Sequence, residues 1–182
     1  MKPVVLVPLG NANRRVVSVL RSSLHPVLGG SVAVSDADVR LEPFFDEQRL
    51  QYNSTSIITH LDSRYAALAG RNGERTILLG VAAEDLCIPI LTFVFGEAQL
   101  NGRVGVVSYH RLQNEMYGLP ANPDLLHARL AKEALHELGH LFGLVHCSSY
   151  ECVMHISTYV EDIDGKGTGY CRECRKHVGE NG

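Results

Sequence analysis

The chain has 182 residues, of which 45% are apolar and 20% are charged, and its formal net charge is −3. This length suits one globular domain with a sizeable core, and an acidic balance without clustered Lys and Arg argues against a nucleic-acid surface. No apolar stretch is long enough for a signal-peptide core or a bilayer span, so we expect a cytoplasmic, single-domain monomer without membrane or nucleic-acid partners.

The first half of the chain alternates expected strands with expected helices. Apolar runs with β-branched residues are typical of buried strands, and they occupy residues 4–9, 31–35 and 76–81. Apolar residues at helical spacing indicate two helices, from Asn11 or Asn13 to Pro26 and from Asn53 to Gly70. This β-α-β-α-β order predicts a largely parallel sheet with right-handed crossovers.

Two further strands are expected over residues 91–95 and 103–108, joined by a connection that contains Asn101-Gly102, a hairpin turn signal. One strand of this pair then runs antiparallel to its partner. An antiparallel edge strand offers unpaired backbone groups to which an extended peptide can add. We expect residues 93–99 to supply this edge.

A long helix is expected to begin at Asn122-Pro123-Asp124, which combine a cap, a proline at the first helical position and an acid in the first turn. Its apolar side consists of Leu125, Leu126, Leu130, Ala134, Leu135, Leu138 and Leu141. Beyond Gly143 the pattern dissolves into turns. A loop is indicated by Asp162, Asp164, Gly165, Gly167 and Gly169, and residues 170–178 suggest a short closing helix. The segment Lys166–Gly169 lacks the leading part of a P-loop and is interpreted as a turn.

The long helix carries a histidine motif. His136 and His140 are four residues apart, so on a helix they stack on one face and can close on a single metal ion. A catalytic zinc usually takes three protein ligands and keeps one position open for water. Gly143 can enter the left-handed conformation at little cost, which lets the chain turn back and bring His146 to the same ion.

Three neutral imidazoles leave most of the charge of a zinc ion uncompensated, which lowers the pKa of bound water toward about 7. Glu137 lies beside the ligand face, and we expect it to accept the proton of this water as general base and to return it to the leaving amine. The predicted reaction is hydrolysis of a peptide or similar amide by a zinc-bound water. The competing interpretation is an amphipathic core helix with surface histidines.

Four of the five cysteines form closely spaced pairs, Cys147 with Cys152 and Cys171 with Cys174. These spacings suit a tetrahedral thiolate zinc that clips the last third of the chain together, and four thiolates leave no open position, so the site would be structural. The alternative is two disulfides in an exported protein. Cys87 stands outside this set and is expected to be a small buried residue.

The stretch from His136 to Cys174 resembles a known family. The long histidine motif, followed by a methionine at Met154, resembles the metzincin signature. His146 directly followed by Cys147, then Cys152 and Met154, then the Cys171–Cys174 pair, is similar to the archaemetzincin branch. The resemblance implies an α/β metzincin-type zincin fold, with a mixed, mostly parallel twisted sheet, an antiparallel edge strand that binds substrate, and an active-site helix.

The resemblance also implies two zinc ions, one catalytic and one structural, within one metalloprotease domain. Residues 1–143 would form the N-terminal subdomain with the sheet and the zinc helix, and residues 144–182 the C-terminal subdomain with the structural zinc. Met154 would form the Met-turn, an apolar floor under the imidazoles, although plain core packing is its alternative interpretation. Ile156 stands where some metzincins carry a tyrosine ligand, while Tyr159 is close enough in sequence to face the substrate.

We therefore expect a zinc-dependent peptidase that acts on peptides or unfolded protein segments. The main alternative is a zinc-stabilised peptide-binding module with little or no catalysis, and the intact Glu137 favours the enzyme. A nucleic-acid-binding zinc ribbon is disfavoured by the acidic balance. The remaining histidines are expected at the surface or as satisfied core residues, and they are His25, His60, His110, His127, His155 and His177.

Overall fold

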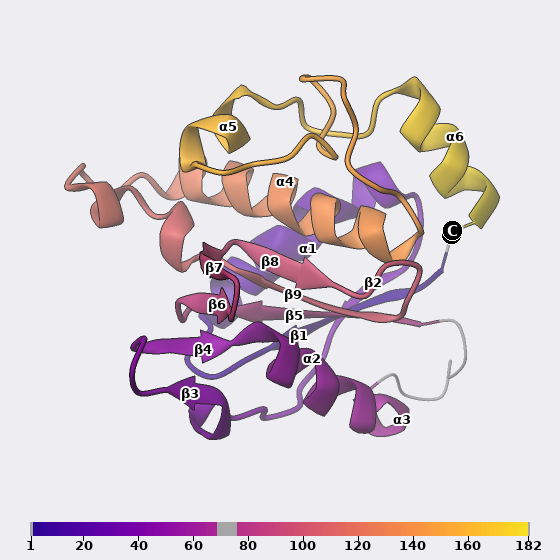
Figure 1. Ribbon diagram of the computed structural model, residues 1–182. Helices are drawn as coiled ribbons and strands as arrows, with labels where there is room; N and C mark the ends of the chain where they lie inside the picture. The colour runs from indigo at the N-terminus through magenta and orange to yellow at the C-terminus, as the bar shows by residue number, and fades with distance from the viewer. Residues whose placement is uncertain (1, 69–75, 182) are drawn as a thin grey trace.

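The computed structural model describes residues 2–68 and 76–181. Its main sheet has five strands in the order β2-β1-β5-β9-β8 (Figure 1). These are β2 (Val32–Val34), β1 (Val4–Pro8), β5 (Ile77–Ala82), β9 (Val104–Ser108) and β8 (Gly96–Ala98). Neighbouring strands are parallel except β8, which pairs antiparallel with β9. This confirms the predicted mostly parallel sheet with an antiparallel strand at its edge.

Helices cover both faces of this sheet (Figure 1). One face packs against α1 (Arg14–Leu28) and α4 (Pro123–Leu141), and the other against α2 (Ser54–Ser63), which α3 (Tyr65–Leu68) follows. The alternation of side chains along β5 explains the two layers, because Leu79 belongs to the apolar cluster under α1 and α4, whereas Leu78 belongs to the cluster under α2. Apolar side chains on both faces are what a buried parallel strand requires.

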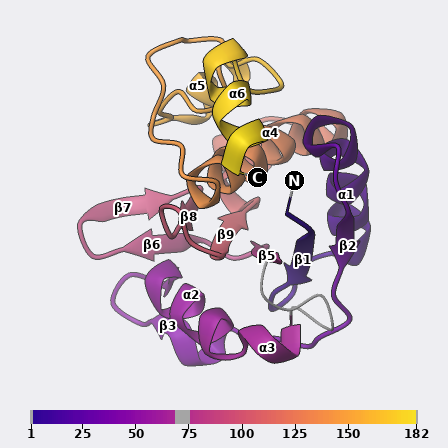
Figure 2. The same ribbon diagram turned by 90° about the vertical axis from the view of Figure 1, so that its right-hand side faces the viewer.

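A second sheet has the order β3-β4-β6-β7 and extends beyond the edge of the first (Figure 2). Its strands are β3 (Phe45–Asp46), β4 (Gln51–Asn53), β6 (Leu86–Ile88) and β7 (Leu91–Val94). The sequence did not predict β3, β4 or β6, because segments of two or three residues are too short to show a periodic pattern.

The predicted hairpin between residues 91–95 and 103–108 is wrong in its first strand. β7 pairs with β6, and it is β8 that forms the hairpin with β9 through the Asn101-Gly102 turn, in which Asn101 has φ +53°. The chain changes partner at Phe95, which is buried and whose carbonyl accepts a hydrogen bond from Ser108 N–H. The edge strand β8 lies within the predicted stretch 93–99 but is shorter.

The helix starts are set by asparagine caps, as predicted. Asn13 accepts a hydrogen bond from Arg15 N–H, Asn53 from Ser56 N–H, and Asn122 from Leu125 N–H.

The helix ends differ from the expectation. The first helix runs past Pro26 to Leu28 and ends at Gly29, which has φ +60°. The second predicted helix is broken at Arg64 into α2 and α3, and its expected end at Gly70 lies outside the described residues.

The C-terminal part packs on the side of α4 that faces away from the sheet (Figure 1). It contains α5 (Val160–Gly165) and α6 (Arg172–Asn181). Earlier in the chain, short 3-10 helices lie at Glu42–Phe44, His110–Leu112 and Asn114–Tyr117. The predicted closing helix is confirmed as α6. The loop predicted from Asp162 to Gly169 is wrong over its first part, because the Asp162 carboxylate accepts hydrogen bonds from the backbone N–H groups of Thr158 and Tyr159 and so caps α5.

One apolar cluster runs from the sheet through α4 into the C-terminal part, since it includes Leu79, Leu138, Met154 and Val178. The single domain and its division into residues 1–143 and 144–182 both stay predictions. Within residues 2–68 and 76–181, no helix combines the length and the apolar character that a bilayer crossing needs.

Candidate metal centre

Helix α4 and the turn after it bring three imidazoles together. His136 and His140 lie one turn apart on α4, and Gly143, with φ +91°, reverses the chain so that His146 returns to them. Each of these three histidines has a ring nitrogen that lies within 4.8 Å of a ring nitrogen of the other two. The structure therefore brings together the three histidines that the sequence singled out.

The hydrogen bonds of these rings show what the cluster can hold. His136 Nδ1 donates to the carbonyl of Val153 at 2.7 Å, and His140 Nδ1 donates to the carbonyl of Leu144 at 2.8 Å. In the neutral rings the proton is therefore on Nδ1 and the lone pair is on Nε2. The two Nε2 atoms face each other at 3.1 Å, so their lone pairs repel unless a cation lies between them.

The same spacing fits zinc. Zn–N bonds of about 2.0–2.1 Å in a tetrahedral arrangement place two nitrogen ligands roughly 3.3 Å apart. Burial lowers the pKa of all three imidazoles, and for His136, where the charge of Lys166 adds to the effect of burial, the pKa falls to about 3. The rings are thus neutral at neutral pH, as metal ligands must be.

Glu137 lies beside the imidazoles and is buried. Burial raises the pKa of its carboxyl well above the ordinary value, and the nearby Glu133 and Glu97 raise it further. A cleft of about 470 Å³ opens in front of it, between α4, the β7–β8 segment and residues 156–158. A carboxylate with a raised pKa in a cleft next to a metal-ligand cluster is suited to proton transfer.

Strand β8 approaches Glu137 closely at Gly96. A Cβ atom at this position would lie 2.6 Å from Glu137 Oε1, so only glycine leaves room for the carboxylate. We expect Gly96→Ala to displace Glu137 or the edge strand and to lower kcat/KM by about 100-fold, the effect of a misplacement of about 1 Å. Steady-state kinetics with a fluorogenic peptide would measure this loss.

The control for this prediction is Gly179→Ala in α6, where an added Cβ meets no atom within 4 Å. This variant is expected to keep wild-type kinetics, and both variants are expected to keep their zinc. An unchanged kcat/KM for Gly96→Ala would show that the contact between Gly96 and Glu137 does not matter for turnover.

Met154 packs directly against α4. It is completely buried, and a Cβ atom at Gly139 would lie 2.3 Å from its sulfur. Gly139 lies between His136 and His140 in the sequence, so the thioether contacts α4 at the level of the two rings. This position agrees with a supporting Met-turn and equally makes Met154 part of the core.

The four paired cysteines also converge. The Sγ atoms of Cys147, Cys152, Cys171 and Cys174 all lie within 4.8 Å of one another. All five cysteines are free thiols. Cys147 Sγ and Cys171 Sγ are 3.9 Å apart, which matches the separation of about 3.8 Å that Zn–S bonds of about 2.3 Å give in a tetrahedron.

Backbone N–H groups point at the same sulfurs. Cys152 Sγ accepts a hydrogen bond from Cys171 N–H at 3.3 Å, and Cys147 Sγ accepts one from Ser149 N–H at 3.4 Å. A backbone hydrogen bond from Cys174 lowers the pKa of Cys171 to about 7, whereas burial raises the pKa of Cys152 and of Cys174. Donors aimed at the sulfurs favour thiolates, which are the form that binds zinc.

Other residues of interest lie outside these clusters. Tyr159 is 65% exposed and does not line the cleft, whereas Ile156 does. His155 Nδ1 donates to the carbonyl of Cys147 at 3.0 Å, and Cys87 is buried apart from the other cysteines, as expected. Sequence reasoning missed the buried pair of Glu133 and Lys166, because a lysine in a glycine-rich segment gives no signal beyond a turn.

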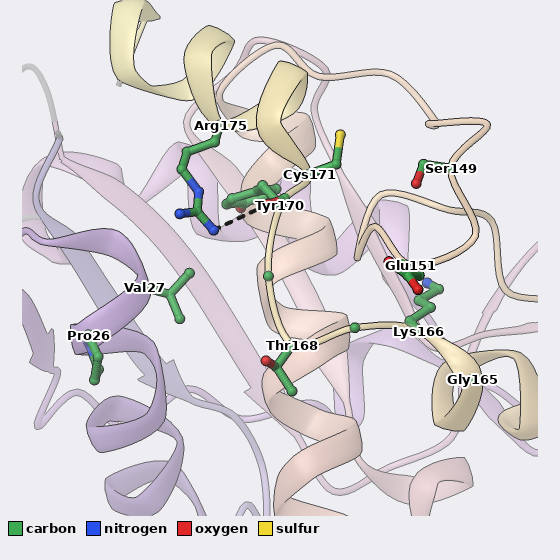
Figure 3. Close-up of a pocket in the computed structure, with 12 residues that line it drawn as sticks. Pro26, Val27, Ser149, Glu151, Gly165, Lys166, Thr168, Tyr170, Cys171 and Arg175 are labelled. Carbon is green, nitrogen blue, oxygen red and sulfur yellow. Dashed lines mark hydrogen bonds between the residues drawn. The ribbon is translucent and has the colours of Figure 1, made fainter.

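A second cavity, of about 680 Å³, lies between the end of α1 and the segment 165–171 (Figure 3). Val27 and Arg175 line it, and the Arg175 guanidinium points to the carbonyl of Tyr170 at 3.4 Å. None of the three clustered histidines lines this cavity. Cys171 of the cysteine cluster does line it.

Curated relatives cover nearly the whole chain. The archaemetzincin of Methanocaldococcus jannaschii is 36% identical over 175 residues, which covers 96% of this chain and 92% of that protein. The archaemetzincin of Archaeoglobus fulgidus is 37% identical over 169 residues, which covers 92% and 94%.

Solved structures show the same fold. A zinc-dependent peptidase from Methanocorpusculum labreanum matches with a TM-score of 0.88 at 30% identity, covering 96% of this chain and 99% of that one. The crystal structure of the archaemetzincin of A. fulgidus, in complex with malonate, matches with a TM-score of 0.80 at 34% identity and the same coverage. The model of peptidase family M54 matches residues 21–180. The chain therefore belongs to peptidase family M54, the archaemetzincins, and is a zinc metallopeptidase.

Proposed function

We propose that His136, His140 and His146 hold the catalytic zinc ion and that Glu137 is the general base. The observation that carries this assignment is the pair of Nε2 atoms facing each other at 3.1 Å while both Nδ1 atoms donate to carbonyls. Glu137 is the carboxylate next in sequence to this cluster, and it opens onto the same cleft.

The chain's own groups account for the proton transfers. Glu137 takes the proton of the attacking water and passes it to the leaving amine, and its raised pKa makes it a stronger base than an exposed glutamate. When bound, zinc supplies a Lewis acid that polarises the scissile carbonyl and acidifies water. The carbonyls of Val153 and Leu144 hold His136 and His140 in the tautomer that leaves Nε2 available.

The cleft supports an extended peptide as substrate. The strand β8 is at the edge of the main sheet, so its free side can pair with an added strand. Phe93, Phe95 and Ile156 line the same cleft and make part of its wall apolar. We propose that the enzyme binds peptides or unfolded segments along β8, with an apolar side chain near the scissile bond.

The proposal includes a second, structural zinc ion bound by the four clustered cysteines. Four sulfurs within 4.8 Å, with no disulfide among them, support this site. Free thiols throughout the chain support a reducing compartment such as the cytoplasm, where we propose that the protein acts as a monomer without a nucleic-acid partner.

Native mass spectrometry together with a peptidase assay tests the proposal. We expect two zinc ions per chain, five reduced thiols, and cleavage of quenched fluorescent peptides that a chelator abolishes and added zinc restores. Zinc binding without cleavage of any peptide in a broad library would favour the binding module over the enzyme. A chain that holds one zinc ion would show that one of the two clusters is wrongly assigned.

A further inference from the structure

A buried ion pair lies beneath the candidate catalytic site. Lys166 Nζ is 3.2 Å from Glu133 Oε1, and the two side chains are 0% and 4% exposed. Ser157 Oγ also lies at 3.5 Å from this Glu133 oxygen. A buried ion pair often contributes less stability than apolar residues of the same size would, so its presence next to a reactive site suggests a role other than stability.

The ion pair reaches the histidine cluster through one carbonyl group. Lys166 Nζ donates to the carbonyl of Val153 at 3.2 Å, and His136 Nδ1 donates to the same oxygen at 2.7 Å. On the other side of this residue, Val153 N–H donates to the carbonyl of Gly169. The Val153 backbone, whose carbonyl accepts the hydrogen bond from His136, is thus fixed by Gly169 at its N–H and by Lys166 at its oxygen. Lys166 is the charged group of the two.

We propose that Lys166 is a positioning residue for His136. Glu133 fixes the ammonium group, the ammonium group fixes the Val153 carbonyl, and that carbonyl sets the tautomer and the orientation of the imidazole. This inference rests on the proposed role of His136 as a zinc ligand. Groups that orient a metal-binding histidine change metal affinity about 10-fold to 100-fold when they are removed.

A second ion pair between the same two regions offers a control, in which the Arg129 side chain is 7% exposed and the Asp164 side chain 37% exposed. Arg129 forms two hydrogen bonds to Asp164, at 2.7 and 2.6 Å, and so also joins α4 to α5. Arg129 is one turn closer to the start of α4, and its remaining hydrogen bonds go to the Leu112 carbonyl and to Asn114. It makes no hydrogen bond to a histidine or to Val153 among those described. A purely structural role for both pairs predicts the same behaviour for both.

The test compares two double variants. One carries Glu133→Gln and Lys166→Met together, and the other carries Arg129→Met and Asp164→Asn together. Removing both charges of a pair avoids an unpaired buried charge, so both proteins are expected to fold. Zinc affinity is measured by competition with a chromophoric chelator, and the His136 ring by nitrogen-15 NMR of the imidazole. We expect zinc affinity to fall 10-fold to 100-fold in the first variant, with an altered His136 Nδ1–H signal.

In the Arg129 and Asp164 variant, zinc affinity and the His136 signal are expected to stay at wild-type values. If the Glu133→Gln and Lys166→Met variant fails to fold, the double variant Glu133→Met with Lys166→Met, which also leaves no unpaired buried charge, is measured in the same way. Wild-type zinc affinity and an unchanged His136 signal after loss of Lys166 would overturn this inference and leave the proposed function intact. A wild-type chain that binds no zinc at the histidine cluster would instead overturn both.

Discussion

Replacing Glu137 by Gln is expected to lower kcat by about 10²-fold to 10⁴-fold while both zinc ions stay bound. The amide has the shape of the carboxylate but cannot accept the proton of the attacking water. Glu137 is not needed as a ligand, because three imidazoles already converge. Native mass spectrometry measures the zinc content, and steady-state kinetics on a fluorogenic peptide measures the turnover.

The same substitution is expected to leave the protein at least as stable as the wild type. A carboxyl whose pKa is raised on folding favours the folded state when it is protonated and opposes folding when it is charged. At neutral pH the amide removes the free-energy cost of burying a charged carboxylate, so the melting temperature should not fall. Glu151→Gln, outside the cleft, is the control and should behave as the wild type. Wild-type turnover by Glu137→Gln would remove Glu137 from the mechanism.

The largest loss of stability is expected from the double variant Cys152→Ser with Cys174→Ser. Both cysteines are buried within the sulfur cluster. A structural zinc contributes its binding free energy to folding, so we expect the variant to lose this ion and about 4 kcal/mol or more of stability. Denaturant unfolding and zinc counting measure the two losses.

Peptidase activity should fall in the same variant. Cys147 N–H donates to the carbonyl of Met154, and Val153, between Cys152 and Met154 in the sequence, supplies the carbonyl that orients His136. Disorder around Cys152 is therefore expected to reach the Val153 carbonyl and the hydrogen bond between Cys147 and Met154, next to His146. Cys87→Ala is the control, since Cys87 is buried away from the cluster, and it should keep two zinc ions. Two bound zinc ions in the double cysteine variant would contradict the assignment of the second site.

Local signals in the sequence predicted the part of the site that lies on one helix. The start of α4 depends on contacts within three residues, such as Leu125 N–H donating to Asn122. The convergence of His146 with His136 depends on one reversal at Gly143, whose positive φ is a property of glycine. Such short-range determinants can be read directly from residue types and spacings.

Contacts between distant residues were beyond this reasoning. Lys166 and Glu133 are 33 residues apart, and nothing in either segment indicates that they meet. The change of partner between β7 and β8 was missed for the same reason, because a strand's own pattern shows which faces are apolar but does not identify its neighbour. The close approach of Gly96 to Glu137 likewise becomes visible only when β8 is placed beside α4.

His146 and Cys147 are consecutive residues, yet their side chains belong to different clusters. In the proposed assignment, one peptide unit therefore anchors the ligand shells of two ions. Ordering this unit at one site removes most of its conformational entropy, so little remains to be lost at the other. In this assignment, metal uptake at the sulfur cluster would order His146 in advance and so lower the entropy cost of closing the histidine cluster on its own ion.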